Sequence, residues 1–337
     1  MLAMIERYTD EYKFSDIHLK EDKPLLLRIR GEIIAPSEDV ISAEELQAFV
    51  DESLDEDQKA HLDEVRDVDL AIVIGPYRFR ANFFYTSAGL SAVMRKIETE
   101  IPTMSDLKLP YIMQEMAEKP NGLILVTGPT GSGKSTSLAS IIGEINANRK
   151  GHILTVEDPI EYIHKAKQCS VSQREIGRDA QSFASALKAS LREDPDVILV
   201  GEMRDRETIQ LALTAAETGH LVFGTLHTSG APNTINRIID VFPAEQQGQV
   251  RAQLSQSLQI VVTQRLFKTA DGQGRAAAFE IMVCNHAVRN LIREAKIFQI
   301  ESIMQTARGE GMITMKEAIE QLILSGKVNQ EDVDGAH

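Results

Sequence analysis

The chain has 337 residues, is 43% hydrophobic and 26% charged, and carries a formal net charge of −14. This composition is typical of a globular protein of two or three domains. The acidic balance argues against nucleic acid as a partner, because the overall field opposes phosphate binding. We expect no signal peptide and no transmembrane segment, since no apolar run approaches about eighteen residues. Two cysteines, Cys169 and Cys284, predict free thiols rather than a disulfide scaffold.

Residues 1–97 predict a small α+β domain. Apolar runs bounded by turn residues predict its strands, and Gly31 marks a hairpin turn. Ser42 with Glu45 forms a capping box that begins a helix. The expected strands cover residues 17–19, 25–29, 33–34, 70–74, 77–85 and 90–97.

Two arginines, Arg80 and Arg95, lie on the last two of these strands. Apolar and polar residues alternate in 77–85, so Arg80 faces away from the predicted core. From the residues alone, a solvated strand face explains both arginines as well as a functional role does. Two prolines and mixed polar residues in 98–110 then predict a linker to a second domain.

The second domain is organised around residues 122–137, GLILVTGPTGSGKSTS. An apolar run predicts a buried strand, GPTGSGKS fits the phosphate-binding loop G-x-x-x-x-G-K-[ST], and a helical pattern follows. Backbone N–H groups of such a loop converge on anionic oxygens. We therefore predict that ATP binds here, with Lys134 reaching its β- and γ-phosphates and Ser135 binding Mg²⁺. The predicted nucleotide-binding residues are Gly128, Pro129, Thr130, Gly131, Ser132, Gly133, Lys134, Ser135 and Thr136.

Strands and helices alternate beyond this loop, which predicts an α/β domain with a mainly parallel sheet. Apolar runs at 152–156, 196–200 and 221–226 each end in polar residues. These residues would fall at the carboxyl edge of the sheet, where open α/β sheets bind ligands. Glu202 follows the second run and is the candidate catalytic acid, with a helix-capping acid as the alternative. Gly201 stands where a usual Walker B segment has aspartate.

Further polar residues follow or flank the other two runs. Glu157, Asp158 and Glu161 form a second acidic group, from which one acid near Mg²⁺ would suffice; solvated turn carboxylates are the alternative. His220 and His227 bracket the third run. A lone histidine is more often structural than a sensor, but a pair around one strand of a nucleotide-binding sheet is a candidate γ-phosphate sensor.

Beyond residue 229 the chain is predicted to be mainly helical. Residues 244–264 form a long amphipathic segment that we interpret as helix, and 265–268 with 275–283 predict a hairpin. Residues 286–296 predict a helix with an apolar side and a basic face. The basic face consists of Arg289, Arg293 and Lys296.

Together these motifs resemble the PilT family, the hexameric motor ATPases of type IV pili within the wider secretion ATPase superfamily. The resemblance covers nearly the whole chain, and several of its motifs are long and specific. They are FSDIHLK at 14–20, the phosphate loop at 128–136, VEDPIEY at 156–162 (similar to the Asp box), REDPDVILVGEMRD at 192–205 (Walker B), AAETGHLVFGTLHT at 215–228 (the His box), and AVRNLIREAK at 287–296, which resembles the retraction motif AIRNLIRE.

The resemblance implies an α/β protein: a PAS-like α+β N-terminal domain at 1–97, a linker at 98–110 and a RecA-like ATPase domain at 111–337. It implies a homohexamer that hydrolyses ATP with Mg²⁺ to power pilus retraction and twitching motility. The ring would lie in the cytoplasm, peripherally attached to the inner membrane at the pilus base through a platform protein. The implied catalytic residues are the acid Glu202, the assisting acid Glu161, the sensors His220 and His227, and Arg80 and Arg95, which reach toward ATP.

Three alternatives to a retraction motor stay open. The first is an extension or secretion motor of the superfamily; these motors usually carry a four-cysteine zinc module, which two distant cysteines cannot supply. The second is the PilU-type accessory retraction ATPase. The sequence looks closer to PilU at 95–110 and 135–143, but more like PilT at 192–205 and 287–296. A nucleotide-gated assembly module without appreciable hydrolysis is the third alternative.

Overall fold

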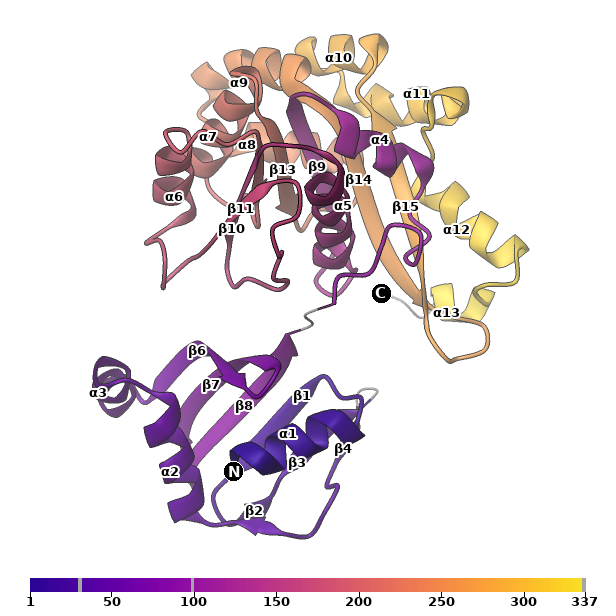
Figure 1. Ribbon diagram of the computed structural model, residues 1–337. Coiled ribbons are helices and arrows are strands. Elements are labelled where there is room, and N and C mark those ends of the chain that lie inside the picture. Colours follow the sequence, from indigo (N-terminus) through magenta and orange to yellow (C-terminus); the bar gives the residue numbers. More distant parts are fainter. Residues whose placement is uncertain (30–31, 98–99, 335–337) are drawn as a thin grey trace. The chain divides into compact units, whose positions relative to one another are not determined.

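The computed structural model describes residues 1–29, 32–97 and 100–334, and the chain divides into two compact units (Figure 1). The first unit comprises residues 1–100 and the second 101–337. The division falls inside the predicted linker, of which residues 98–99 lie outside the described part. In the described parts of the chain, no helix combines the length and apolar character needed to cross a membrane.

The N-terminal unit is an antiparallel sheet with helices packed on one face. Its order is β4-β3-β1-β8-β7-β6. Phe79, Ala81 and Phe83 are fully buried and pack in one cluster with residues of the three helices, while Arg80 is exposed, as the alternation predicted. The elements are α1 (Leu2–Glu11), β1 (Asp16–Lys20), β2 (Lys23–Pro24), β3 (Leu26–Ile29), β4 (Glu32–Ile34), β5 (Val40–Ile41), α2 (Ala43–Ser53), α3 (Glu56–Val65), β6 (Asp67–Ile74), β7 (Tyr77–Thr86) and β8 (Gly89–Ile97).

The predicted strands of this unit are all present. β3 and β4 pair as the expected hairpin, although Gly31 at its turn lies outside the described residues. The capping box is also confirmed, because Ser42 accepts from the N–H of Glu45 and Glu45 from that of Ser42. The sequence reasoning missed α1 and α3, whose charged residues weaken the apolar periodicity.

The C-terminal unit is a seven-stranded sheet of order β11-β10-β12-β13-β9-β14-β15, parallel except for β15. Its strands are β9 (Gly122–Thr127), β10 (His152–Glu157), β11 (Ser170–Glu175), β12 (Val197–Val200), β13 (Leu221–Leu226), β14 (Leu258–Lys268) and β15 (Arg275–Val283). Its helices are α4 (Tyr111–Glu118), α5 (Lys134–Asn148), α6 (Phe183–Ser190), α7 (Arg206–Glu217), α8 (Ala231–Asp240), α9 (Ala244–Ser257), α10 (His286–Arg293), α11 (Ile300–Thr306), α12 (Met315–Leu324) and α13 (Gln330–Asp334). Short 3₁₀ turns, η1 (Ile297–Gln299) and η2 (Arg308–Glu310), complete it.

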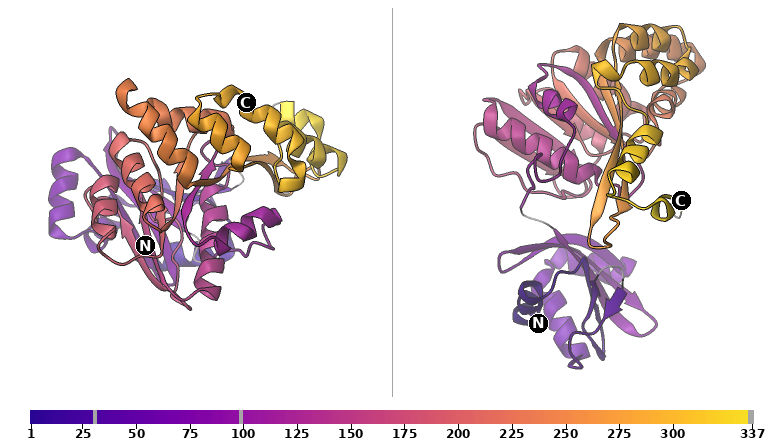
Figure 2. Two further views of the ribbon diagram at one scale, coloured as in Figure 1. Left: turned by 90° about the horizontal axis from the view of Figure 1, so that it is seen from above. Right: turned by 90° about the vertical axis from the view of Figure 1, so that its right-hand side faces the viewer.

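Helices cover both faces of this sheet (Figure 2). In β9, Leu123 and Leu125 belong to the core shared with α7 to α11, whereas Ile124 and Val126 belong to the core shared with α4 and α5. Successive strand residues point to opposite faces, so an uninterrupted apolar strand is what a sheet buried on both sides requires. The predicted α/β architecture is therefore present.

The helix predicted at 244–264 is wrong beyond Ser257. The last residues of that segment form β14, which lies between β9 and β15 and pairs with β9 in parallel, with Val262 opposite Val126. β14 contains the β-branched residues Ile260, Val261 and Val262, which favour strands. The predicted hairpin is the far end of the longer β14–β15 pair.

The basic face predicted on α10 is also only partly correct. Val288 and Ile292 are buried as expected, and Arg293 is exposed. The guanidinium of Arg289 instead donates hydrogen bonds to three backbone carbonyls, those of Ser255 (2.8 Å), Gln256 (2.8 Å) and Cys284 (3.0 Å). The last carbonyls of a helix have no intrahelical partner, so Arg289 caps the end of α9.

Arg289→Ala should therefore destabilise the protein, and Arg293→Ala should not. Arg289→Ala leaves three carbonyls without this donor, and an unmet polar group typically costs about 1–3 kcal/mol. The exposed Arg293→Ala should stay within about 0.5 kcal/mol of wild type. Urea unfolding of both variants measures the difference, and equal midpoints would contradict this role of Arg289.

Candidate functional site

The phosphate loop joins β9 to α5, and β14 lies directly behind it. Gly128 has a φ of 136° and Gly133, the N-cap of α5, has a φ of 88°. A Cβ on Gly128 would lie 2.3 Å from the carbonyl oxygen of Gln264, and one on Gly133 would lie 2.8 Å from Nε2 of the same residue. Both glycines are thus required by backbone angle and by the closeness of β14.

Side chains fasten the loop and the first turn of α5 to their surroundings. Ser137 Oγ donates to Gln264 Oε1 (2.9 Å), and Thr136 Oγ1 lies 2.9 Å from the hydroxyl of Tyr162. The buried hydroxyl of Ser132 has no hydrogen-bond partner within the described structure. Such a hydroxyl at a loop of exposed N–H groups suits an anionic ligand.

Lys134 is 8% exposed, and its Nζ donates to the carbonyls of Gly128 (2.9 Å) and Pro129 (3.0 Å). Burial lowers the pKa of Lys134, although the negative charges of Glu202 and Glu161 act in the opposite direction. A buried ammonium favours an anion close by. Lys134 is therefore placed to take phosphate oxygens in exchange for its own loop carbonyls.

Glu202 lies at the carboxyl edge of the sheet with two cationic or potentially cationic neighbours. Its Oε1 is 2.5 Å from Nε of Arg204 and 3.3 Å from Nε2 of His227. Burial by itself raises the pKa of Glu202, but the hydrogen bond from Arg204 and the neighbouring His227 outweigh burial and lower that pKa overall. The acid is therefore ionised near neutral pH. The strand order β12-β13-β9 brings Glu202, His227 and the phosphate loop to one edge.

The second acidic group divides between Glu157, which is half-buried, and Glu161, which is exposed. Glu157 Oε1 accepts from Thr155 Oγ1 (2.6 Å) and from Gln173 Nε2 (3.3 Å). Burial raises the pKa of Glu157 to about 7. Glu161 is exposed, and its charge acts on both Lys134 and Glu157. Glu157, at the end of β10, and Glu161, four residues later, thus have different surroundings.

His220 lies at the opposite edge of the sheet from the phosphate loop, and Arg80 and Arg95 belong to the N-terminal unit. His220 precedes β13 whereas His227 follows it, so roughly 20 Å of strand separates them. The ring Nδ1 of His220 lies 2.9 Å from the carbonyl of Ala215. Arg80 and Arg95 are opposite each other on β7 and β8 of the N-terminal unit. Their partners are carboxylates of that unit: Arg80 contacts Asp69 at 2.5 Å and Arg95 contacts Asp16 at 2.8 Å.

A hollow of about 780 Å³ opens beside the phosphate loop. Gly133, Thr136 and Ser137 line one end. The β14–β15 hairpin, residues 106–109, and Leu322, Gly326 and Lys327 line the rest. The sequence reasoning missed this hollow and also Gln264, because Gln264 was assigned to a helix. The sequence pattern likewise did not predict that Arg204 would pair with Glu202.

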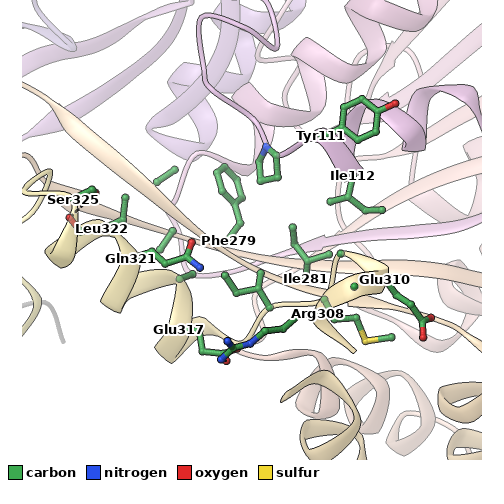
Figure 3. Close-up of a pocket in the computed structure, with 18 of the residues that line it drawn as sticks. Tyr111, Ile112, Phe279, Ile281, Arg308, Glu310, Glu317, Gln321, Leu322 and Ser325 are labelled. Carbon is green, nitrogen blue, oxygen red and sulfur yellow. Dashed lines mark hydrogen bonds and ion pairs between the residues drawn. The ribbon is translucent and has the colours of Figure 1, made fainter. Parts of the chain in front are cut away.

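A second pocket of about 1000 Å³ lies elsewhere, between α4, β15 and α12 (Figure 3). Its lining includes the apolar Ile112, Phe279 and Ile281, with Arg308 and Glu317 paired at its margin. It contains none of the predicted site residues.

Glu157→Gln should change how stability depends on pH. The Glu157 carboxyl loses its proton at about pH 7 when folded and near 4.5 when unfolded, so the folded state binds more protons between these values. Wild type therefore loses stability as the pH rises through this window. Glutamine cannot ionise, so the variant should become more stable relative to wild type as the pH rises. Its advantage should be greatest above about pH 7.

Thermal unfolding without nucleotide at about pH 5 and about pH 8 measures this difference. The buried His164, whose pKa burial lowers to about 4, is present in both proteins, so its titration cancels in the comparison. A difference in Tm that does not change with pH would contradict the raised pKa of Glu157.

Comparison with known proteins agrees with this arrangement. The family model described as type II/IV secretion system protein matches residues 5–335. The chain is 50% identical over 307 residues to a twitching motility protein of Neisseria gonorrhoeae, covering 91% of this chain and 82% of that protein. Over 319 residues, or 94% of this chain, it is 46% identical to the type IV pilus retraction ATPase PilT of Pseudomonas aeruginosa and 40% identical to PilU of the same species, covering 92% and 84% of those proteins.

The fold has the same relatives. A crystal structure of the pilus retraction motor PilT with bound ADP superposes with a TM-score of 0.93 at 47% identity, covering all of this chain and 96% of that one. The Legionella pneumophila ATPase DotB superposes with a TM-score of 0.85 at 28% identity, covering 99% and 95%. The predicted fold class, an N-terminal domain followed by a RecA-like ATPase domain, is confirmed. The chain belongs to the type II/IV secretion system protein family and is similar to the PilT retraction ATPase along nearly its whole length.

Proposed function

We propose that this chain is a motor ATPase that hydrolyses ATP to power type IV pilus retraction. The observation that carries the proposal is the edge of the sheet at which an ionised Glu202 and the buried Lys134 share one electrostatic environment. Phosphoryl transfer to water needs both a cation for the phosphates and a group that orients the water. Similarity to PilT along nearly the full chain supports retraction as the output.

The nucleotide site follows from the loop. Lys134 Nζ, the Ser132 hydroxyl and the first N–H groups of α5 can bind the phosphates. The adjacent hollow has room for the base and ribose. Ser135, at the start of α5, is placed to hold Mg²⁺ through its hydroxyl, and bound Mg²⁺ would neutralise charge on the phosphate oxygens. The donor set fits Mg²⁺–ATP.

Glu202 orients the attacking water and can accept its proton. Arg204 and His227 keep the carboxylate ionised and fix its position. Glu161 adds a second, solvent-facing carboxylate near Lys134. Lys134 stays charged against the phosphates, where it stabilises charge that develops in the transition state.

The proposal includes a ring. Arg80 and Arg95 extend from an exposed face of the N-terminal unit, each held by a carboxylate, and we propose that they complete ATP sites in a homohexamer. His220, at the opposite end of β13 from His227, would then respond to nucleotide across a subunit boundary. We place the ring in the cytoplasm, docked on an inner-membrane platform protein at the pilus base.

PilT-type retraction is the better proposal than its rivals within the family. The chain is more similar to PilT than to PilU when both come from one species. Cys169 and Cys284 are both buried, free thiols. In the described residues no three histidine, cysteine or acidic side chains gather into a metal site.

Glu202→Gln should bind ATP and hydrolyse very little of it. The substitution keeps the size of the side chain and removes the charge that orients and deprotonates water. Purified variant and wild type would be compared for nucleotide affinity and phosphate release, with a loss of at least about a hundredfold in rate expected. Hydrolysis near the wild-type rate would remove Glu202 from the mechanism.

Arg293→Ala combined with Lys296→Ala should uncouple hydrolysis from movement. Both side chains are exposed near α10, far along the chain from the phosphate-binding residues. The double variant should assemble and hydrolyse ATP as wild type does, yet cells carrying it should not twitch. Unlike Arg289→Ala, neither Arg293→Ala nor Lys296→Ala removes a helix cap. Normal twitching by the double variant would refute the coupling role of this surface.

A further inference from the structure

Position 201 poses a structural problem for Mg²⁺ binding. In phosphate-loop ATPases, Mg²⁺ is held by the loop Ser or Thr and by an aspartate at the end of a neighbouring strand. Here Gly201 occupies the aspartate position. A Cβ on Gly201 would lie 3.1 Å from the carbonyl oxygen of Val156 and 3.1 Å from Cα of Glu157. A side chain at position 201 would therefore be in steric conflict with the backbone of β10 unless that backbone shifted.

The same approach brings the acidic residue Glu157 beside this position. β10 and β12 are parallel neighbours, with Val156 opposite Val200, so Glu157 and Gly201 leave the sheet side by side. The Cβ of Glu157 would be 3.6 Å from a Cβ at 201. An acidic residue of β10 is therefore the neighbour of the position that lacks one on β12, and both residues line the same cavity.

A small, partly open cavity lies between Glu157 and Ser135, the last residue of the phosphate-loop motif. Its volume is about 30 Å³, and a buried water needs roughly 10–15 Å³. Several of the lining residues carry polar groups, as a hydrated cavity requires. The polar residues among them are Ser135, Glu157, Tyr162, His164 and Thr225.

One of these residues has a buried polar atom that the protein does not satisfy. His164 is 7% exposed, and its ring Nδ1 has no hydrogen-bond partner in the described part of the chain. Gln173 fixes both His164 and Glu157, since its Oε1 accepts from the N–H of His164 (2.8 Å) and its Nε2 donates to Glu157 (3.3 Å). A buried polar atom on a polar cavity of this size is the usual place for an ordered water.

We propose that water in this cavity links Glu157 and His164 to the hydroxyl of Ser135, so that Glu157 positions bound Mg²⁺ in place of the aspartate that Gly201 replaces. This inference rests on the proposed function, since it concerns the Mg²⁺ that accompanies ATP. Asp158 and Glu161 are exposed and do not line the cavity. Glu157 is a positioning residue that acts through water and through Ser135.

Nucleotide binding at varied Mg²⁺ concentration tests the proposal without hydrolysis. The probe is a fluorescent ADP analogue, titrated into wild type, Glu157→Gln and the matched control Asp158→Asn. Loss of an outer-shell partner typically costs 10–100-fold in metal affinity. In Glu157→Gln, the Mg²⁺ concentration at which Mg²⁺ changes the affinity for the ADP analogue should therefore rise at least about tenfold. The affinity for the analogue in EDTA, without free Mg²⁺, should be unchanged. Asp158→Asn should behave as wild type.

Each outcome distinguishes this inference from the proposed function. If wild type does not bind the ADP analogue, the proposed function fails. If wild type binds but Glu157→Gln has the wild-type Mg²⁺ requirement, or loses affinity equally in EDTA, the positioning role is overturned. Thermal unfolding without nucleotide confirms that each variant is folded.

His164→Phe tests the water itself. Phenylalanine keeps the ring but removes the unpartnered nitrogen, and with it a hydrogen bond to the water. This variant should also raise the Mg²⁺ requirement while leaving affinity in EDTA unchanged. An unaltered Mg²⁺ requirement in a folded His164→Phe protein would contradict the water link.

Discussion

The pairing of β14 with β9 is the constraint on which the rest of the C-terminal unit depends. It places the backbone and side chain of Gln264 directly against the phosphate loop. Gly128 and Gly133 allow this close approach because they have no Cβ. Ser137 bonds Gln264, and Thr127 bonds Thr263 across the same pair of strands (3.0 Å). The loop's shape is thus set by a strand more than a hundred residues later in the chain.

With the loop fixed, the parallel order of the strands brings the charges together. Burial disfavours the ammonium of Lys134, and the carboxylates of Glu202 and Glu161 favour it. Glu202 is itself kept ionised by Arg204 and His227. Cation and anion therefore stabilise each other's charged forms, which is what binding a phosphate and activating a water demand of one site.

Local patterns predicted those parts of the site that the chain forms from consecutive residues. The phosphate loop and the strand that ends before Glu202 are signalled by glycines, apolar runs and their lengths. The helix assigned to Leu258–Gln264 was wrong because a short apolar run fits strand or helix equally well, and only pairing with β9 decides. Arg289 has helical spacing, but its acceptors belong to α9 and to Cys284, so spacing could not reveal its role. The cavity beside Glu157 likewise depends on strand neighbours.

The same constraint connects the nucleotide site to the surface that we assign to coupling. β14 begins at Leu258, immediately after α9 ends at Ser257, and runs to Gln264 behind the phosphate loop. Arg289 binds the last turn of α9 through the carbonyls of Ser255 and Gln256, and so joins α10 to the start of that strand. A shift of β14 at the phosphate loop would be passed through these contacts to the end of α9 and to α10 with its exposed basic residues. Because packed elements move as units rather than deform continuously, we propose that this chain of contacts carries work from hydrolysis to a docked partner.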